Sequence, residues 1–158
     1  MPLVNIRMKL KMRNLAVGDA IRFPESSCVA CRTTRDYIIL VHQKRPLHDK
    51  YTLEIPGGKI ETGESPQECA AREMAEEIGI KPSNLDFLLV LDLDFSASIH
   101  RTHIFTTLID HQSALTDGVV LIPIAEANKL IMSGKISHAP TVVALLSFLV
   151  VKGKFNEP

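Results

Sequence analysis

Three glutamates, Glu73, Glu76 and Glu77, are the residues whose spacing most clearly points to chemistry. Residues three and four apart are neighbours on a helix, so a helix through them gathers the three carboxylates on one face, within one turn. Like charges placed so close repel one another, at a cost of about a few tenths of a kcal/mol per pair on an exposed helix. Three hard oxygen donors on one face suit magnesium or manganese, whereas a solvated acidic face is the plain alternative.

Local signals bound the helix that carries these carboxylates. Ser65 can cap its start, Pro66 suits the first helical position, and Glu68 completes a capping box. Gly79 suits the end of a helix. We therefore predict a helix from about Pro66 to Ile78, with an apolar side facing the core that is made of Ala70, Ala71, Met74 and Ile78.

Three glycines, Gly57, Gly58 and Gly63, precede this helix. A glycine backbone can bend sharply and approach a ligand or metal closely, so a carbonyl here could add an oxygen ligand. Arg72 lies beside the acidic face and can hold a carboxylate in place without occupying a metal position. Glu64, just before the helix, is a further partner for Arg72. A glycine turn, a capped helix and a triple carboxylate within 25 residues are much rarer together than any one part.

The elements around this segment predict an α/β fold with a mixed sheet in one domain, residues 1–158. The order of elements lacks the regular βαβ alternation of a doubly wound fold. The strand-like runs are 26–33, 36–44, 51–55, 86–95, 101–109 and 118–124. Two further helices are expected near 126–132 and from about 140 to 151. The alternating run 4–13 predicts a half-buried N-terminal strand with a basic outer face.

Composition excludes several classes of function. Lys plus Arg (18) balance Asp plus Glu (18), which argues against a general electrostatic nucleic-acid binder. No stretch approaches the ~20 apolar residues of a membrane span. The three cysteines suggest a reducing compartment and hence, weakly, the cytoplasm. Cys28 and Cys31 lack a second ligand pair for zinc and are expected to be buried in a strand.

Gly58, five residues, Glu64, seven residues, and then the run Arg72-Glu73-Met74-Ala75-Glu76-Glu77-Ile78-Gly79-Ile80 match the Nudix box in full. The chain therefore resembles the Nudix hydrolases. The resemblance implies an α/β/α sandwich that hydrolyses a nucleoside diphosphate linked to another group, using Mg²⁺ or Mn²⁺. It also implies that Glu73, Glu76 and Glu77 bind the metal with the carbonyl of Gly57, and that Arg72 and Glu64 orient them.

Within that family the run 41–59 and the tail 122–149 resemble ADP-ribose and nucleotide-sugar pyrophosphatases. This resemblance implies that Arg45, Glu54 and Gly58 contact the substrate. Two departures stand against it. The branch usually has Ala-Gly where this chain has Gly57-Gly58, and the run Asp92–His103 holds no glutamate to serve as the base. The base is therefore open between a box glutamate and a residue of that run.

Two other interpretations stay open. The glycine pair resembles the MutT-like branch, which cleaves nucleoside triphosphates, and a binding module without turnover is the third. The chain is expected to bind a small nucleotide and no nucleic acid or membrane, and a homodimer is compatible with the N-terminal run. His100 or His103 is expected at a surface or substrate edge. The remaining histidines are expected to be ordinary: His42, His48, His111 and His138.

Overall fold

The computed structural model describes residues 20–110 and 116–154, with side chains up to residue 150. The expected N-terminal strand at 4–13 and His111 lie outside the described residues. The single domain over residues 1–158 stays a prediction.

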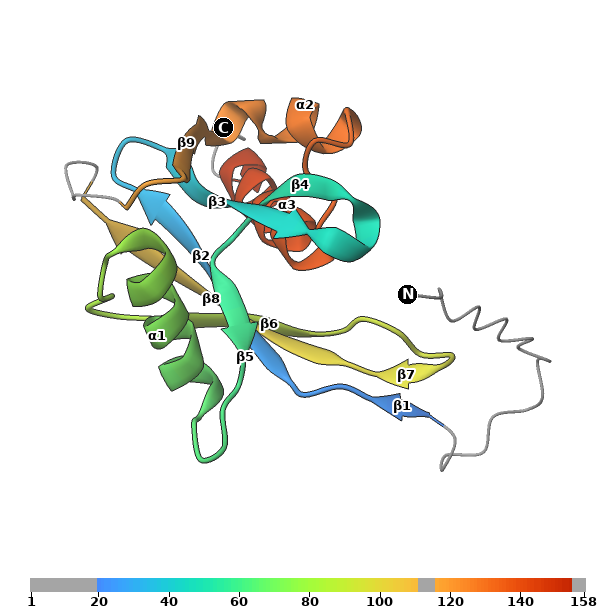
Figure 1. Cartoon of the computed structure of the whole chain (residues 1–158). Coiled ribbons are helices and arrows are strands. Elements are labelled where there is room, and N and C mark those ends of the chain that lie inside the picture. The colour runs from blue at the N-terminus through green and yellow to red at the C-terminus, as the bar shows by residue number, and fades with distance from the viewer. Residues whose placement is uncertain (1–19, 111–115, 155–158) are drawn as a thin grey trace.

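A seven-stranded mixed sheet forms the middle layer of the fold (Figure 1). Its central path runs β4-β3-β2-β8-β6, with β5 paired to β2 and β9 paired to β3. Only the β2–β8 pair is parallel within this sheet. The strands are β2 (Ser26–Thr33), β3 (Tyr37–Arg45), β4 (Lys50–Glu54), β5 (Gly57–Lys59), β6 (Asp86–Asp92), β8 (Arg101–Ile109) and β9 (Val119–Pro123).

Helices cover both faces of this sheet, which confirms the predicted sandwich. Helix α1 (Pro66–Ile78) packs on one face, and α2 (Ala127–Met132) and α3 (Ala139–Lys154) lie on the other (Figure 1). Alternate residues of β2 enter different cores, because successive side chains of a strand point to opposite faces. Val29 packs with the α1 side and Ala30 with the α3 side.

The described residues also include two 3-10 helices: η2 (Pro46–His48) follows β3, and η3 (Ile124–Glu126) follows β9. Among the helices of residues 20–110 and 116–154, none is long and apolar enough to cross a membrane.

Strands β2 and β3 pair only next to the turn that joins them, at Cys31–Ile39 and Arg32–Ile38. Beyond this point the two strands diverge. The first half of β2 pairs with β5, and β3 continues beside β4 and β9. This divergence opens the sheet beside the glycines of β5, where the candidate site lies.

A second, smaller sheet consists of β1 (Ile21–Arg22) and β7 (Ser98–Ile99), which are parallel. It extends away from the main sheet as an arm (Figure 1). The arm region carries exposed apolar side chains: Ile21, Phe23, Phe95 and Ile99.

Candidate functional site

The carboxylate helix α1 begins and ends where the sequence predicts. Ser65 Oγ accepts from the Glu68 backbone N–H at 3.3 Å, and the Glu68 carboxylate accepts from the Ser65 N–H at 2.8 Å. Gly79 ends the helix in the left-handed region at φ 78°, which glycine adopts without strain. Met74 and Ile78 are fully buried against the sheet, so the helix holds its opposite face toward β5.

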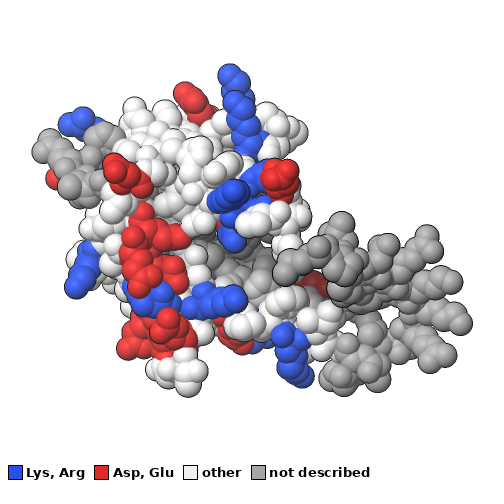
Figure 2. Space-filling model, viewed as in Figure 1, with Lys and Arg blue, Asp and Glu red and all other residues white. Residues whose placement is uncertain are grey.

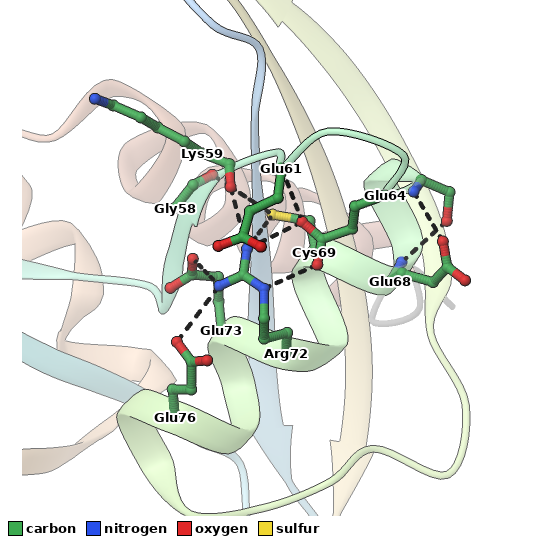
Figure 3. A network of polar contacts seen from close by, with 10 residues as sticks. Gly58, Lys59, Glu61, Glu64, Glu68, Cys69, Arg72, Glu73 and Glu76 are labelled. Atoms are coloured by element: carbon green, nitrogen blue, oxygen red, sulfur yellow. Dashed lines mark hydrogen bonds and ion pairs between the residues drawn. The ribbon is translucent and has the colours of Figure 1, made fainter.

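Arg72 is the centre of a network of polar contacts on that face (Figure 3). Its Nε and Nη2 donate to the two oxygens of Glu64 at 2.8 and 3.0 Å. Its Nη1 donates to Glu73 at 2.7 Å and more weakly to Glu76 at 3.4 Å. Nη2 also donates to the carbonyl of Lys59 on β5 at 3.1 Å. Arg72 therefore connects the loop, the strand and two of the three box carboxylates.

These contacts keep both partners of the main pair charged. The Arg72 guanidinium, with a backbone N–H from Glu61, lowers the pKa of Glu64 to about 2. Hydrogen bonds to Glu64 and Glu73 raise the pKa of Arg72 above its usual value. Arg72 thus stays cationic among the carboxylates and offsets part of their repulsion.

Glu77 points away from Arg72, toward the strands. Its carboxylate accepts from Gln43 Nε2 on β3 at 2.5 Å and from the Gly57 backbone N–H at 3.0 Å. Burial raises the pKa of Glu77, and the neighbouring charges of Glu73 and Glu54 add to the effect. A buried carboxylate near other carboxylates gains from a cation more than an exposed one does.

The two glycines of β5 are needed for space rather than for unusual backbone angles. A Cβ built on Gly58 would lie 2.1 Å from Glu73 Oε1, and one built on Gly57 would lie 2.5 Å from the Cβ of Cys28 and 2.6 Å from the Ser27 carbonyl. Gly57 therefore lets β5 lie directly against β2, which gives the departure from Ala-Gly at this position a physical reason. Gly58 lets the Glu73 carboxylate reach the strand.

A cavity of about 660 Å³ opens on the other side of β5. It lies where β2 and β3 diverge, and Gly57, Gly58 and Lys59 form part of its wall. The other charged side chains and the histidines that line it are Lys44, Arg45, His48, Lys50, Glu54, His100 and His138. Figure 2 shows the Asp and Glu side chains gathered in a band over α1 and Lys and Arg side chains beside it. The carboxylate helix and a largely cationic cavity thus share one short strand.

Arg45 and Glu54, the expected substrate contacts, form a two-pronged ion pair at the cavity. Arg45 Nε donates to Glu54 Oε1 at 2.8 Å, and Nη2 donates to Oε2. The Glu54 side chain is only 3% exposed, whereas that of Arg45 is 47% exposed. His138, at the start of α3, lies 3.3 Å from Glu54 Oε2.

The box carboxylates have the right donor chemistry for magnesium or manganese, since they supply hard oxygens on one helical face. Within residues 20–110 and 116–154, however, no three His, Cys, Asp or Glu side chains lie together as a ready ligand set. Glu73 and Glu76 accept from Arg72, while Glu77 accepts from Gln43 and Gly57. Glu73 and Glu76 each accept from Arg72 through one oxygen, so an ion could bind their second oxygens while Arg72 stays in place.

Three titratable side chains of the Asp92–His103 run contact other protein groups. Asp92 accepts from Arg101 at 3.2 Å, and Asp94 accepts from the backbone of Ser96 at 2.8 Å. His103 Nε2 lies 2.7 Å from the carboxylate of Glu25. The box glutamates are hydrogen-bonded as well, so the base stays open between a box glutamate and a residue of this run. His100 lines the cavity and packs against Phe23, with ring centroids 5.3 Å apart.

The three cysteines are free and buried, as expected. Cys28 and Cys31 enter opposite cores of the sheet, so this CxxC cannot pair on one metal. Burial raises the pKa of each thiol to about 12, which leaves all three protonated at neutral pH. Cys69 fills the space under β5, with Sγ 3.4 Å from the Lys59 carbonyl.

Sequence reasoning missed Gln43 and misjudged His138. Gln43 lies on the strand run that leads to Arg45, and strand alternation alone could not show that it reaches Glu77. The expectation that His138 is an ordinary histidine was wrong. Its Nδ1 lies 2.9 Å from Thr141 Oγ1 and 3.3 Å from Glu54, because the start of α3 packs beside the end of β4. A contact between residues 84 positions apart carries no local signal.

Comparisons with known proteins give a consistent result. The sequence model of the NUDIX domain matches residues 22–132. An ADP-ribose pyrophosphatase of Mycobacterium tuberculosis is 31% identical over 77% of this chain and 63% of its own length. A hydrolase of CMP-5'-(N-acetyl-N-hydroxy-3-aminopropyl)phosphonate from Streptomyces rubellomurinus is 27% identical over 87% of this chain and 70% of its own length.

Among solved structures, a crystal structure titled as an ADP compounds hydrolase superposes with a TM-score of 0.68. That protein is 27% identical to this chain, and the match covers 82% of this chain and 74% of the other. The likeness therefore extends beyond the box to the strands and helices that surround it.

Proposed function

Because this chain belongs to the Nudix domain family, we propose that it hydrolyses the pyrophosphate bond of a nucleoside diphosphate derivative, with ADP-ribose or a nucleotide sugar as the first candidates. The observation that carries the proposal is strand β5. One side of this strand contacts the box carboxylates, and Gly57, Gly58 and Lys59 also line the cationic cavity. A pyrophosphate that lies along β5 would be next to the box carboxylates and to the cationic side chains of the cavity.

Glu73, Glu76 and Glu77 are the proposed carboxylate ligands of a divalent cation, Mg²⁺ or Mn²⁺, with the Gly57 carbonyl as a further oxygen. Such an ion supplies charge neutralisation for the phosphates and a nucleophile at neutral pH. The donor set and the raised pKa of Glu77 support this assignment. Arg72 holds Glu73 and Glu76 on the side of α1 that faces β5, and Glu64 orients Arg72 in turn.

The substrate is proposed to enter the cavity with its anionic groups toward Arg45 and the neighbouring lysines. Lys44 and Lys59 line the same cavity, and a guanidinium matches phosphate oxygens in geometry as well as in charge. Gly58 contributes a backbone without a side chain, so that the substrate can approach the strand closely.

In the proposed reaction water attacks one phosphorus, and the bond from that phosphorus to the bridging oxygen breaks. The bridging oxygen leaves with the other phosphate. The proton of the attacking water passes to a box carboxylate. With ADP-ribose the products are AMP and ribose phosphate.

The test is incubation of the purified protein with magnesium and a panel of substrates, followed by separation of the products. The panel holds ADP-ribose, nucleotide sugars, dinucleoside polyphosphates and nucleoside triphosphates. AMP plus ribose phosphate from ADP-ribose supports the proposal. If neither wild type nor Glu77→Gln hydrolyses any member of the panel, the proposal is overturned in favour of a binding module.

A MutT-like triphosphate hydrolase is the second candidate, and the glycine pair favours it. Gly57 has no room for the alanine that the ADP-ribose branch usually carries there, because Cys28 and Ser27 of β2 lie too close. Monophosphate plus pyrophosphate from triphosphates, with ADP-ribose untouched, would select this candidate.

We further propose that the chain acts in the cytoplasm and forms homodimers. The three free, buried cysteines support a reducing compartment. The exposed apolar side chains of the β1–β7 arm, such as Phe23 and Phe95, support self-association. Light scattering after size-exclusion chromatography measures the second point directly, and a monomeric mass at micromolar concentration would overturn it.

A further inference from the structure

The carboxylate of Glu54 is held by three hydrogen bonds from neighbouring side chains, and a histidine nitrogen lies close to it. An ionised carboxylate offers about four lone-pair sites. Arg45 Nε and Thr52 Oγ1 donate to Oε1, Arg45 Nη2 donates to Oε2, and His138 Nδ1 lies 3.3 Å from Oε2. With a side chain only 3% exposed, Glu54 can influence a substrate only through the groups that it holds.

Arg45 is the held group that faces the cavity. A guanidinium carries five N–H donors in a fixed plane, and the two bonds to Glu54 use one on Nε and one on Nη2. The remaining donors belong to a half-exposed side chain that lines the cavity. Because two parallel bonds fix the plane of the guanidinium, they also fix the direction of those remaining donors.

His138 fixes Glu54 from the other side. Its Nδ1 lies 2.9 Å from Thr141 Oγ1, and that oxygen accepts from the Ile55 backbone N–H at 3.0 Å. A ring nitrogen this close to a carboxylate oxygen is favourable as an N–H, so we assign the proton to Nδ1. A second link lies beside it, where Lys50 Nζ donates to Ser137 Oγ at 3.1 Å.

We propose that His138 is a positioning residue: together with Thr141 it anchors Glu54 to the start of α3, and through Glu54 it aims the free N–H donors of Arg45 at an anionic group of the substrate. This inference rests on the proposed function for the identity of the substrate. In this proposal Glu54 does not contact the substrate itself, contrary to the expectation from the sequence, but holds Arg45, which does.

The experiment compares His138→Leu, which removes the N–H, with His138→Asn, whose amide can donate from a similar place. Steady-state hydrolysis of ADP-ribose with magnesium is measured for both. We expect His138→Leu to raise KM about tenfold with kcat within twofold, and His138→Asn to stay within about threefold of wild type in both constants. His42→Leu is the matched control, because His42 is exposed on β3 and outside the cavity lining.

A double variant tests whether the effect passes through Arg45. If His138 acts by aiming Arg45, then Arg45→Lys already removes what His138 supports, and adding His138→Leu raises KM by less than twofold more. The inference would be overturned if the rise in KM of the double variant equalled the product of the rises in the two single variants. An unchanged KM in His138→Leu would also overturn it, as would an equal loss of kcat in the Leu and Asn variants.

The outcome separates the inference from the proposed function. If wild type hydrolyses nothing in the panel, the proposed function fails, and calorimetric binding of inorganic pyrophosphate then tests His138 without turnover. Binding about tenfold weaker in His138→Leu than in wild type and His138→Asn supports the inference. Equal binding in all three overturns it.

Discussion

The Glu73 carboxylate lies directly over the α-carbon of Gly58, so close that a Cβ on Gly58 would come within 2.1 Å of its Oε1. The strand of the cavity and the helix of the carboxylates therefore meet at a position where any side chain larger than glycine would contact Glu73. The atom in the way is the end of a flexible side chain, and this decides what a substitution would do.

Gly58→Ala should reduce activity while it leaves the fold intact. The new methyl group displaces the Glu73 carboxylate rather than the backbone, so the midpoint of thermal unfolding should stay nearly unchanged. A misplaced catalytic group can lower the rate by about a hundredfold. Initial rates with ADP-ribose check the loss of activity, and a thermal melt of the same sample checks the unchanged midpoint. Full activity would show that the position of Glu73 against β5 is not used.

Gly57→Ala, in contrast to Gly58→Ala, should mainly lower the stability of the fold. Its Cβ would meet the Cα and Cβ of Cys28 and the carbonyl of Ser27, which cannot turn away. We expect a loss of about 1–3 kcal/mol in the free energy of unfolding, the range for overpacked positions. Urea unfolding measures it. A smaller loss than in Gly58→Ala would contradict the close packing of β5 on β2.

Magnesium should stabilise the protein through Glu77, because a cation relieves the desolvated charge of this carboxylate. Thermal melts with magnesium and with a chelator should differ in wild type and coincide in Glu77→Gln. Hydrolysis should fall at least about a hundredfold in that variant, since a catalytic ion supplies several kcal/mol. An equal magnesium shift in both proteins would place the ion elsewhere.

Arg72→Lys should weaken the site although it keeps the charge. A lysine ammonium cannot reproduce the fork that joins Glu64, Glu73 and the Lys59 carbonyl. We expect about 1 kcal/mol lost in unfolding by urea and about tenfold in kcat. Arg101→Lys is the control, because Arg101 makes only exposed pairs, and it should stay within about 0.5 kcal/mol of wild type.

Stability should fall on mild acidification because of His138. Burial lowers the pKa of His138 in the folded chain, so the unfolded chain takes up a proton there first. The contribution is fully present above the unfolded value of about 6.5 and is lost as the pH falls from there toward the lower folded pKa. Urea unfolding between pH 8 and 5 should therefore show a shallower decline in His138→Asn than in wild type. Parallel curves would contradict the shifted pKa.

The sequence by itself determined the helix and its chemistry. Ser65, Glu68 and Gly79 set the bounds of α1 through bonds within a few residues, and the 3.6-residue period put Glu73, Glu76 and Glu77 on one face. Such signals are local, so they can be read without the fold. The strand-like runs likewise indicated the strands of the mixed sheet.

Tertiary structure alone decided how those carboxylates are partnered. The contact of Gln43 with Glu77 joins residues 34 positions apart, and the contact of His138 with Glu54 joins residues 84 positions apart. Long-range pairs of this kind depend on how strands twist and helices pack, and no spacing in the sequence encodes them. The sequence therefore determined that three carboxylates share one face of a helix, and packing determined which side chains contact them.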